Sequence, residues 1–461
     1  MADRHSIQST TEPERMASAG GVGMIWLAAT MTASTLPLGA LIATLFPHAA
    51  FFWVVAVAAA FFLGVGVLSL PGYRLGIPTM AVSERVFGKG ANRLVSLASW
   101  FSQIGWQAVV LVLVVFTVRS VLVYTRLVQG PEALYVAIVF SVLANFAVPV
   151  AGYGAIVRAQ TVSSVMMGLF ALYIFLHLGG LPLLAHGHGP VSFLQTAGAI
   201  SLALMGGALS WTMFASDYSR FIPSRTRSWR VAFWPALGGA AGGSLVLALS
   251  FVLYFRGGIA LGPSGLSLSA GGMASAPLYL GFCLFAMLGL LASNFLNSYS
   301  SAFSLAVFLG RDLDRKWVTV TDAALATGIA LYVLFVSPSF LDTFQTFLDL
   351  LILVAAPWTG LMLVRVLLGP GISGTGPEPL EGAASVLILV AGIAATAAFS
   401  DNPLWTGAGA GLFQDTDLSP LAGFGLAAFL GLACRPLLRA AGNRIPRAVA
   451  AEVAGQPGAG E

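Results

Sequence analysis

The sequence predicts an all-α polytopic membrane protein with about twelve transmembrane helices. Its 461 residues are 57% hydrophobic and only 9% charged, and the mean hydropathy is +0.88. Apolar runs of about 20 residues recur along the chain, and each is long enough to cross a hydrocarbon core of about 30 Å. Because a water-soluble protein of this length carries far more charge, the class of soluble enzymes is excluded.

The apolar runs divide the chain into spans whose loops differ strongly in charge. Of the 22 Lys and Arg residues, only Arg119, Arg126 and Arg256 fall on the side opposite the two ends of the chain. Basic residues concentrate on the cytoplasmic side of membrane proteins, so we expect both termini to be cytoplasmic. The predicted spans are 22–46, 50–70, 94–118, 133–151, 161–185, 196–216, 231–255, 279–309, 319–337, 343–367, 383–399 and 418–436.

The ends of the chain and its few cysteines exclude several other classes. Residues 1–20 mix both charge signs with Ser and Thr and have no signal-peptide pattern, so we expect a disordered tail there. The net charge of +4 does not indicate nucleic-acid binding, because the basic residues flank the membrane. Cys283 and Cys434 lie in or at the end of apolar runs, so a disulfide framework is not expected.

The first span contains hydroxyl and small residues at mid-length, before Pro37 and Gly39. Proline removes an amide donor from a helix. Backbone groups that are freed inside a membrane must then be satisfied by neighbours, water or an ion. An unwound segment here would offer carbonyl groups to a cation and helix ends to a ligand. The alternative is a helix that is only kinked.

The sixth span ends in Gly207–Arg220, which combines small residues, the large aromatic Trp211 and the acid Asp217. This combination favours a place where the backbone approaches a ligand closely. The alternative is a small-residue packing face followed by an interfacial tryptophan. The sixth span is also a second candidate for interruption, and it lies five spans after the first, as expected for two five-helix units of inverted topology.

Two other spans carry polar side chains at membrane depth. In the third, Gln103, Trp106 and Gln107 share one helical face, which indicates either a polar cavity or an inter-helix hydrogen bond. In the eighth, Asn294 and Asn297 stand among several serines in the densest polar patch of any span. Neutral amides and hydroxyls suit an uncharged heterocycle or a desolvated cation, although they could also join helices.

The remaining ionisable residues indicate functional sites less strongly. Asp349 in the tenth span is interpreted as a proton-linked acid or as a residue facing a pore. His177, His186 and His188 lie at a helix end and in a loop, without Cys or Glu nearby, so solvated side chains are favoured over a metal site. Residues 70–93 are expected to form a cytoplasmic connector between the second and third spans, and Gly88 and Gly90 do not complete a phosphate-binding motif.

Competing function classes lack their motifs. The sequence contains no HExxH, no GxSxG and no pair of carboxylates in the middle of one span, so we do not expect an enzyme. A ligand sensor would need an output domain, and we expect neither tail to supply one. We expect no cofactor and no nucleic-acid partner.

Four separated stretches of the sequence form a recognisable pattern. They are Trp26–Gly39, Gly72–Asn92 continuing to Ile104-Gly105-Trp106, Ser210–Pro223, and Asn294-x-x-Asn297-x-Tyr299-Ser300. Ala356-Pro357-Trp358 adds a weaker fifth. In their order and spacing, these stretches resemble a known family, the purine–cytosine permeases of the nucleobase–cation symporters. The resemblance covers roughly residues 20–365.

The resemblance implies a leucine-transporter-like fold that works by alternating access. The expected divisions are a tail at 1–20, a ten-helix core at 21–368 with inverted repeats at 21–185 and 196–368, two peripheral helices within 369–437, and a cytoplasmic tail at 438–461. It also implies a multi-pass protein of the inner or plasma membrane, which we expect to be bacterial. The implied function is import of a neutral nucleobase, cytosine or a purine, coupled to Na⁺ or H⁺.

The resemblance also assigns roles to individual residues. Trp106 fits an aromatic that stacks on the base, and Trp211 is its expected counterpart on the sixth helix, although Ala208 could occupy that place instead. Asn294 and Asn297 would bind the edge of the base. The other residues that we expect at the substrate are Gln103, Gln107 and Ser34.

Two departures from the family pattern leave alternatives open. Many relatives have an amide one turn after Trp106, where this chain has Val110. Sodium-coupled relatives often carry two adjacent hydroxyl residues on the eighth helix, where this chain has Ala292-Ser293. A sodium site would then consist of Ser293, the Gly289 carbonyl and carbonyls near Ala29 and Thr32. Hydantoin, allantoin or a thiamine precursor remains an alternative substrate.

Overall fold

The computed structural model describes residues 7–151, 153–177, 190–255, 259–262, 265–268, 276–368, 372 and 376–435. These residues are helical apart from short connections and one antiparallel hairpin, β1 (Ile259–Gly262) with β2 (Gly265–Leu268). The all-α prediction is therefore confirmed, and the hairpin is an addition to it. The longer helices are α1 (Ala19–Thr30), α2 (Thr35–Leu45), α3 (Phe51–Leu75), α4 (Thr79–Tyr124), α5 (Glu132–Ala151), α6 (Tyr153–His177), α7 (Phe193–Met205), α10 (Ser228–Phe255), α11 (Ala276–Leu309), α12 (Arg315–Phe335), α13 (Phe340–Leu368), α14 (Pro379–Phe399) and α15 (Ser419–Ala433).

Many of these helices can span a bilayer. Within the described residues, nine helical segments are long and apolar enough to cross a membrane, or ten if the bent pair α1–α2 forms one span. Helices α6 and α15 are additional to these, and α15, with 15 residues, is shorter than each of the nine segments. The number twelve stays a prediction. The second half of the predicted span 161–185 lies outside the described residues.

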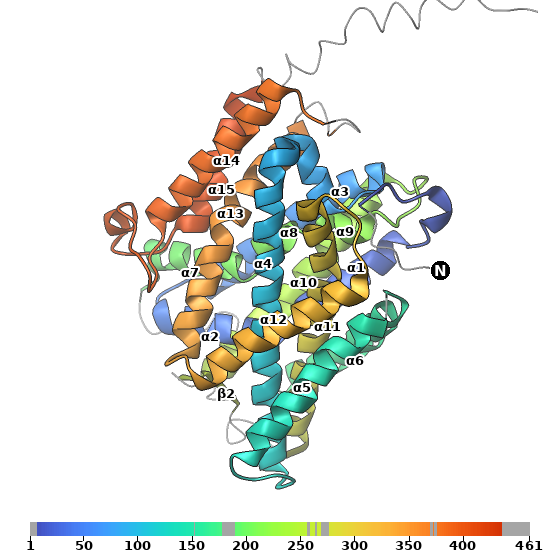
Figure 1. Cartoon of the computed structure of the whole chain (residues 1–461). Coiled ribbons are helices and arrows are strands. Elements are labelled where there is room, and N and C mark those ends of the chain that lie inside the picture. Colours follow the sequence, from blue (N-terminus) through green and yellow to red (C-terminus); the bar gives the residue numbers. More distant parts are fainter. Residues whose placement is uncertain are drawn as a thin grey trace, which may run out of the picture.

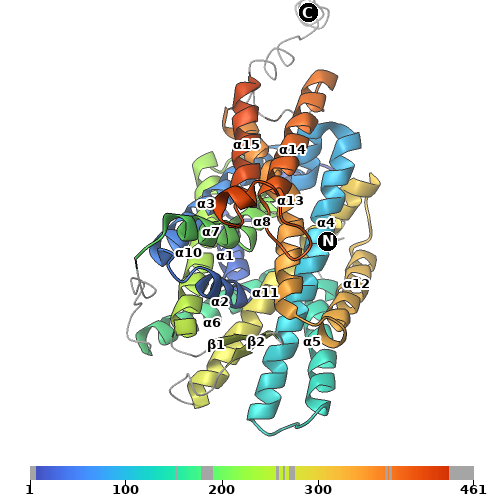
Figure 2. The same cartoon turned by 90° about the vertical axis from the view of Figure 1, so that its left-hand side faces the viewer.

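Helix α4 is the longest helix and runs along most of the length of the molecule in both views (Figures 1 and 2). It packs most extensively against α11, while α10 packs against α1 and α3. Helices α14 and α15 form a pair against α13, at the opposite end from α5 and α6 (Figures 1 and 2). A buried ion pair between Arg365 of α13 and Glu381 of α14 joins this pair to the rest of the protein.

The first predicted span is broken, which answers the question that its sequence left open. Helix α1 ends at Thr30, α2 begins at Thr35, and the two are bent by 56°. The break precedes Pro37 instead of coinciding with it. Pro37 lies in the first turn of α2, where amide groups have no intrahelical acceptor and the missing donor therefore costs nothing.

The sixth predicted span is interrupted as well. Helix α7 ends at Met205, and two short helices, α8 (Ala208–Thr212) and α9 (Ala215–Ser219), continue the span. Gly206 lies close to α2, because a Cβ atom added to it would stand 2.7 Å from Cδ2 of Leu38. The small residues between the two helical parts thus let the broken first and sixth spans approach each other.

The connector predicted at residues 70–93 is largely helical. Helix α3 continues to Leu75, and Gly76 ends it in the left-handed conformation with φ 70°. Helix α4 then begins at Thr79 and contains one break at Gly88, whose φ of 76° favours glycine. The polar composition of this segment marks helices that end outside the membrane, and not an absence of helix.

The expectation of a disordered N-terminal tail is wrong for residues 7–18. Thr10 and Arg15 are buried. Thr10 N donates to the Gly76 carbonyl at 2.8 Å, and Arg15 Nη1 donates to the Tyr73 carbonyl at 2.7 Å. The reason is that hydroxyl and guanidinium groups, which the composition marks as solvated, satisfy the carbonyl groups at the C-terminus of α3.

Close packing of α1 on α10 depends on glycine, and Gly238→Ala should lower the free energy of unfolding by about 2 kcal/mol. A Cβ atom at Gly238 would stand 2.1 Å from the Gly23 carbonyl oxygen, so the backbones must separate. Thermal unfolding of the purified protein in detergent measures the change. Gly328→Ala on α12 is the matched control, because its added Cβ has no atom within 4 Å. Equal losses in both variants would contradict the prediction.

Candidate binding cavity

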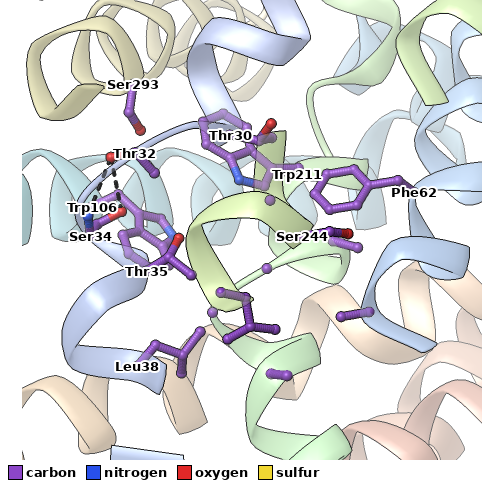
Figure 3. Close-up of a pocket in the computed structure, with 17 residues that line it drawn as sticks. Thr30, Thr32, Ser34, Thr35, Leu38, Phe62, Trp106, Trp211, Ser244 and Ser293 are labelled. Atoms are coloured by element: carbon purple, nitrogen blue, oxygen red, sulfur yellow. Dashed lines mark hydrogen bonds between the residues drawn. The ribbon is translucent and has the colours of Figure 1, made fainter. Parts of the chain in front are cut away.

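A cavity of about 40 Å³ lies where the broken first and sixth spans meet α4, α3, α10 and α11 (Figure 3). Both helix breaks contribute to its wall, so backbone groups without intrahelical partners stand close to it. Its lining residues are Thr30, Thr32, Ser34, Thr35, Leu38, Ala58, Phe62, Trp106, Ala203, Gly206, Gly207, Ala208, Trp211, Gly243, Ser244, Leu247 and Ser293.

The wall of this cavity carries no charged side chain. Its polar atoms are hydroxyl groups and backbone groups, and its apolar part contains two indoles and the ring of Phe62. A charged ligand would leave water without gaining a counter-ion here, which is costly in an apolar environment. The cavity is therefore suited to a small neutral ligand with an apolar face.

Trp106 and Trp211, both predicted for the substrate site, line this cavity at different parts of its wall (Figure 3). Trp106 is positioned by α13, since its ring packs edge-on against Phe344 and Phe347 at centroid distances of 6.2 and 5.4 Å. Trp211 packs edge-on against Trp26 at 5.6 Å. Both indoles are thus held by other aromatic rings, which leaves little freedom for either to collapse into the cavity.

Residues predicted for a cation lie around the break between α1 and α2. Thr32 and Ser293 line the cavity together with Ser34, and the hydroxyls of Thr32 and Ser34 lie 3.2 Å apart (Figure 3). Gly289 lies against the break, because a Cβ atom added there would stand 2.5 Å from the Met31 carbonyl oxygen. Ala29 is fully buried and does not line the cavity.

Part of the α11 surface next to this cation region is already occupied by another side chain. The Ala292 carbonyl accepts a hydrogen bond from Nε2 of Gln160 on α6 at 2.6 Å. Ala292 also lacks the hydroxyl that a neighbouring Ser or Thr would supply. The oxygen atoms that remain for a cation are the hydroxyls of Ser293, Thr32 and Ser34 and carbonyls of the helix break, without a second hydroxyl next to Ser293 on α11.

The two predicted asparagines of α11 are buried beside the cavity and are not part of its wall. Asn294 is 0% exposed and Asn297 is 2% exposed. Neither Oδ1 nor Nδ2 of Asn294 has a hydrogen-bond partner among the described residues. A buried amide without partners costs free energy, about 1–3 kcal/mol for each unsatisfied group. Such a cost is typical of a group that binds a ligand in another state.

The two glutamines of α4 are not part of the cavity wall and join helices instead. Gln103 Nε2 donates to Ser304 Oγ of α11 at 2.9 Å, and Gln107 Nε2 donates to Oδ2 of Asp322 on α12 at 3.4 Å. The sequence allowed either a polar cavity or an inter-helix hydrogen bond, and the structure has inter-helix hydrogen bonds at both glutamines. Helical periodicity placed them on one face with Trp106, but the face is wide enough to contact three neighbours.

Some cavity residues were not predicted from the sequence. Phe62 of α3 and Ser244 of α10 belong to the second and seventh predicted spans, in which the sequence marked no candidate residue. Asp322 was also not predicted, although a signal existed. It is an acid within the apolar run 319–337, and an ionisable residue inside a membrane span is by itself an indication of function.

No group of three or more His, Cys, Asp or Glu side chains that could hold a metal ion occurs within the described part of the chain. His186 and His188 lie outside that part, as does the side chain of His177.

Comparisons with known proteins agree with this arrangement. The sequence profile of a family described as permeases for cytosine/purines, uracil, thiamine and allantoin matches residues 10–370. The purine-cytosine permease FCY21 of Saccharomyces cerevisiae is 25% identical over 378 residues, which cover 75% of this chain and 68% of the yeast protein.

Solved structures of transporters share the fold. Mhp1, a nucleobase-cation-symport-1 family transporter solved in a closed conformation with bromovinylhydantoin bound, superposes with a TM-score of 0.69 at 15% identity, covering 94% of this chain and 95% of that chain. A Na⁺-coupled sialic acid symporter, in a substrate-bound outward-open state, gives a TM-score of 0.58 at 16% identity over 92% and 91% of the two chains. At these identities, the likeness shows the fold.

Proposed function

Because the chain belongs to the family of permeases for cytosine/purines, uracil, thiamine and allantoin, we propose that it is a symporter for a neutral nucleobase, either cytosine or a purine. Transport proceeds by alternating access and is driven by Na⁺ or H⁺. The observation that carries this proposal is the uncharged cavity at the two helix breaks, bordered by Trp106 and Trp211.

The aromatic part of the wall supports a flat ring as the substrate. An indole offers its face to any heterocycle, and base–aromatic stacking contributes about 1–3 kcal/mol per base in proteins that bind nucleic acids. Trp106 is fixed by α13 and Trp211 by Trp26. A ring that enters between these elements gains contact area while the side chains lose little conformational entropy.

The polar groups support selectivity for a neutral base. An amide donates through Nδ2 and accepts through Oδ1, and this matches the alternating donors and acceptors at the edge of cytosine or a purine. Asn294 is such a group without partners among the described residues, and it directly follows the cavity-lining Ser293. In this proposal, substrate binding brings the Asn294 amide to the cavity, and Asn297, one helical turn after Ser293, borders the same region.

The residues at the break between α1 and α2 support the identity of the coupling ion less strongly than the cavity supports the class of substrate. Ser293, Thr32 and Gly289 are near the carbonyl groups of Met31–Ser34, as expected for a sodium site. However, the Ala292 carbonyl is engaged by Gln160, and Ala292 supplies no hydroxyl. A proton as the coupling ion therefore remains a full alternative in this proposal.

Uptake into proteoliposomes tests the proposal. Labelled cytosine, adenine, hypoxanthine and uracil are offered separately under an inward Na⁺ gradient and under an inward H⁺ gradient. We expect concentrative uptake of at least one base under one gradient, and saturation at rising concentration. Liposomes without protein, and liposomes with both gradients collapsed by ionophores, are the controls.

The same vesicles distinguish the alternative substrates of the family. Unlabelled hydantoin, allantoin and a thiamine precursor are added as competitors of the labelled base. If no base is taken up, while direct uptake of one of these compounds is observed, the nucleobase proposal is overturned and the second candidate takes its place. Val110, which stands where relatives carry an amide, is then the first residue to exchange.

A further inference from the structure

A buried acid on α12 lies outside the cavity and is not explained by substrate binding. Asp322 is 0% exposed and is positioned within the predicted membrane span Lys316–Phe335. Burying a carboxyl group inside a membrane span costs free energy, because the group loses water and needs protein partners instead. Its contacts therefore indicate what it does.

Three neutral donors surround the Asp322 carboxyl group. Trp100 Nε1 donates to Oδ1 at 3.1 Å, Gln107 Nε2 donates to Oδ2 at 3.4 Å, and the Ser301 hydroxyl also donates to Oδ2. The first two residues belong to α4 and the third to α11. The carboxyl group thus joins three helices, and no counter-ion contacts it within the described ranges.

The described charged side chains on the neighbouring helices do not neutralise Asp322. The helices that pack against α12 are α4, α5, α11 and α13, and none of their charged or titratable side chains contacts Asp322 within the described residues. Those side chains, together with the ones on α12 itself, are Glu84, Arg85, Lys89, Arg93, Arg119, Tyr124, Glu132, Tyr135, Tyr279, Cys283, Tyr299, Lys316, Tyr332, Asp342, Asp349 and Arg365.

The surroundings can satisfy Asp322 in both protonation states. An ionised carboxylate accepts the three hydrogen bonds that the structure contains. A protonated carboxyl group carries an O–H donor and needs an acceptor. Oε1 of Gln107 is buried without a partner among the described residues. Rotation of the Gln107 amide by half a turn would present this oxygen to the O–H group, so the hydrogen bond survives in reversed direction.

This amide connects the acid to the cavity. Gln107 directly follows the cavity residue Trp106 in α4. Ser301 is about two helical turns from Ser293 on α11, and the bond from Gln103 to Ser304 fixes α4 and α11 together. A change in the hydrogen bonds of Asp322 therefore acts on the two helices that carry an indole and the amides of the proposed site.

We propose that Asp322 is a proton-binding site through which a proton gradient drives transport, an inference that rests on the proposed symport function. A proton from the side of higher concentration forms an O–H bond at Oδ2 and neutralises the carboxylate. Release to the opposite side breaks that bond and restores the charge, so one proton crosses per cycle. A metal cation does not fit, because three donors point hydrogens at the carboxyl oxygens and the indole of Trp100 has no acceptor.

The alternative acid, Asp349 on α13, lacks these connections. It is 1% exposed, and its Oδ2 atom has no partner among the described residues. No hydrogen bond in the described part of the chain joins it to α4 or α11, so its ionisation has no bonded route to the cavity. Asp349→Asn is consequently the matched control for Asp322→Asn.

Reconstituted full-length protein tests the proposal with the labelled base that the wild-type protein transports. Under an inward gradient of one pH unit, one proton per base allows accumulation of up to about tenfold. We expect Asp322→Asn to bind the base and exchange labelled for unlabelled base at wild-type rates, with an accumulation ratio near one. Asp322→Glu, which keeps a protonatable group, should restore part of the accumulation, and Asp349→Asn should retain all of it.

Several results would overturn the assignment. These are full accumulation by Asp322→Asn, loss of accumulation in Asp349→Asn instead, or wild-type accumulation under a Na⁺ gradient but not under a H⁺ gradient. A second readout needs no substrate. Infrared difference spectra recorded across a pH titration should contain a carboxyl band that is missing in Asp322→Asn, and identical spectra would count against the site. If no base is transported but this band is present, the function proposed above fails while the protonation site stands.

Discussion

Replacing Asn294 by alanine should weaken binding of the transported base by about 10–100-fold and should not reduce the stability of the protein. Both polar atoms of this amide are buried without a partner in the described part of the chain, so the folded protein without substrate gains nothing from them. The wild-type complex gains hydrogen bonds to the base edge, and the variant loses them. A residue that only joins helices would give the opposite result.

Asn294→Ala should therefore lower the affinity for the base without lowering the free energy of unfolding. Removing an unsatisfied buried amide relieves a desolvation penalty of about 1–3 kcal/mol per group, which offsets the small void that alanine leaves. Destabilising groups of this kind are tolerated where function requires them. Equilibrium binding of labelled base to the purified protein measures the affinity, and thermal unfolding in the same detergent measures the stability.

Asn92→Ala is the matched control, since the substitution is the same and Asn92 is also 0% exposed. Its Nδ2 donates to the Met80 carbonyl at 2.9 Å and to Ser96 Oγ at 3.3 Å. We therefore expect the control to lose stability and to keep its affinity for the base. If Asn294→Ala loses stability as Asn92→Ala does, with affinity unchanged, Asn294 is structural and its place in the site is wrong.

The sequence predicted the fold well because membrane helices leave a strong signal. Long apolar runs and the distribution of Arg and Lys define spans without any knowledge of packing. The break in the first span was also indicated, since small and hydroxyl residues precede Pro37. Its location at Met31–Ser34 was not predicted, because proline is as favourable in the first turn of a helix as it is unfavourable in the middle.

Side-chain partners were harder to predict than helices. Helical periodicity places Gln103, Trp106 and Gln107 on one face, but that face meets the cavity, α11 and α12 at once, so periodicity cannot say which residue meets which neighbour. Phe62 and Ser244 reach the cavity only because α3 and α10 pack around the broken spans. Such positions follow from tertiary packing, and no local pattern contains them.

The N-terminal segment shows a different limit of prediction from composition. Its polar residues resemble those of a disordered tail, yet Thr10 and Arg15 bond to carbonyl groups at the end of α3. Composition measures whether a segment can bury apolar area. It does not register polar side chains that are ordered because a helix C-terminus nearby has unpaired acceptors.

Asp217→Ala should destabilise the protein by about 3 kcal/mol or more, the largest stability effect that we expect of any single substitution discussed above. The acid follows Trp211 closely in sequence, which suggested a role beside the ligand. In the structure, its Oδ1 atom instead accepts hydrogen bonds from the backbone N–H of Thr79 at 2.8 Å and from the Thr79 hydroxyl at 2.9 Å. Asp217 is 2% exposed, so water does not replace these bonds easily.

The bonds of Asp217 combine two favourable effects. Thr79 is the first residue of α4, where the amide groups have no intrahelical acceptor and the helix dipole favours an acid. The Thr79 hydroxyl in turn accepts a hydrogen bond from the backbone N–H of Ser216 at 2.9 Å. The acid therefore caps α4 from another part of the chain and fixes α9 against it, and alanine would leave buried donors without acceptors.

Thermal unfolding of Asp217→Ala and Asp217→Asn separates the effects of geometry and charge. Asparagine keeps an oxygen acceptor for both Thr79 donors, so we expect most of the stability to be retained, whereas alanine retains none of these bonds. Because α9 continues from α8, which carries Trp211 at the cavity, loosening this cap should also lower the affinity for the base in the alanine variant. If the alanine variant unfolds at the wild-type temperature, the cap contributes nothing, and Asp217 must be considered for the ligand role that its sequence position first suggested.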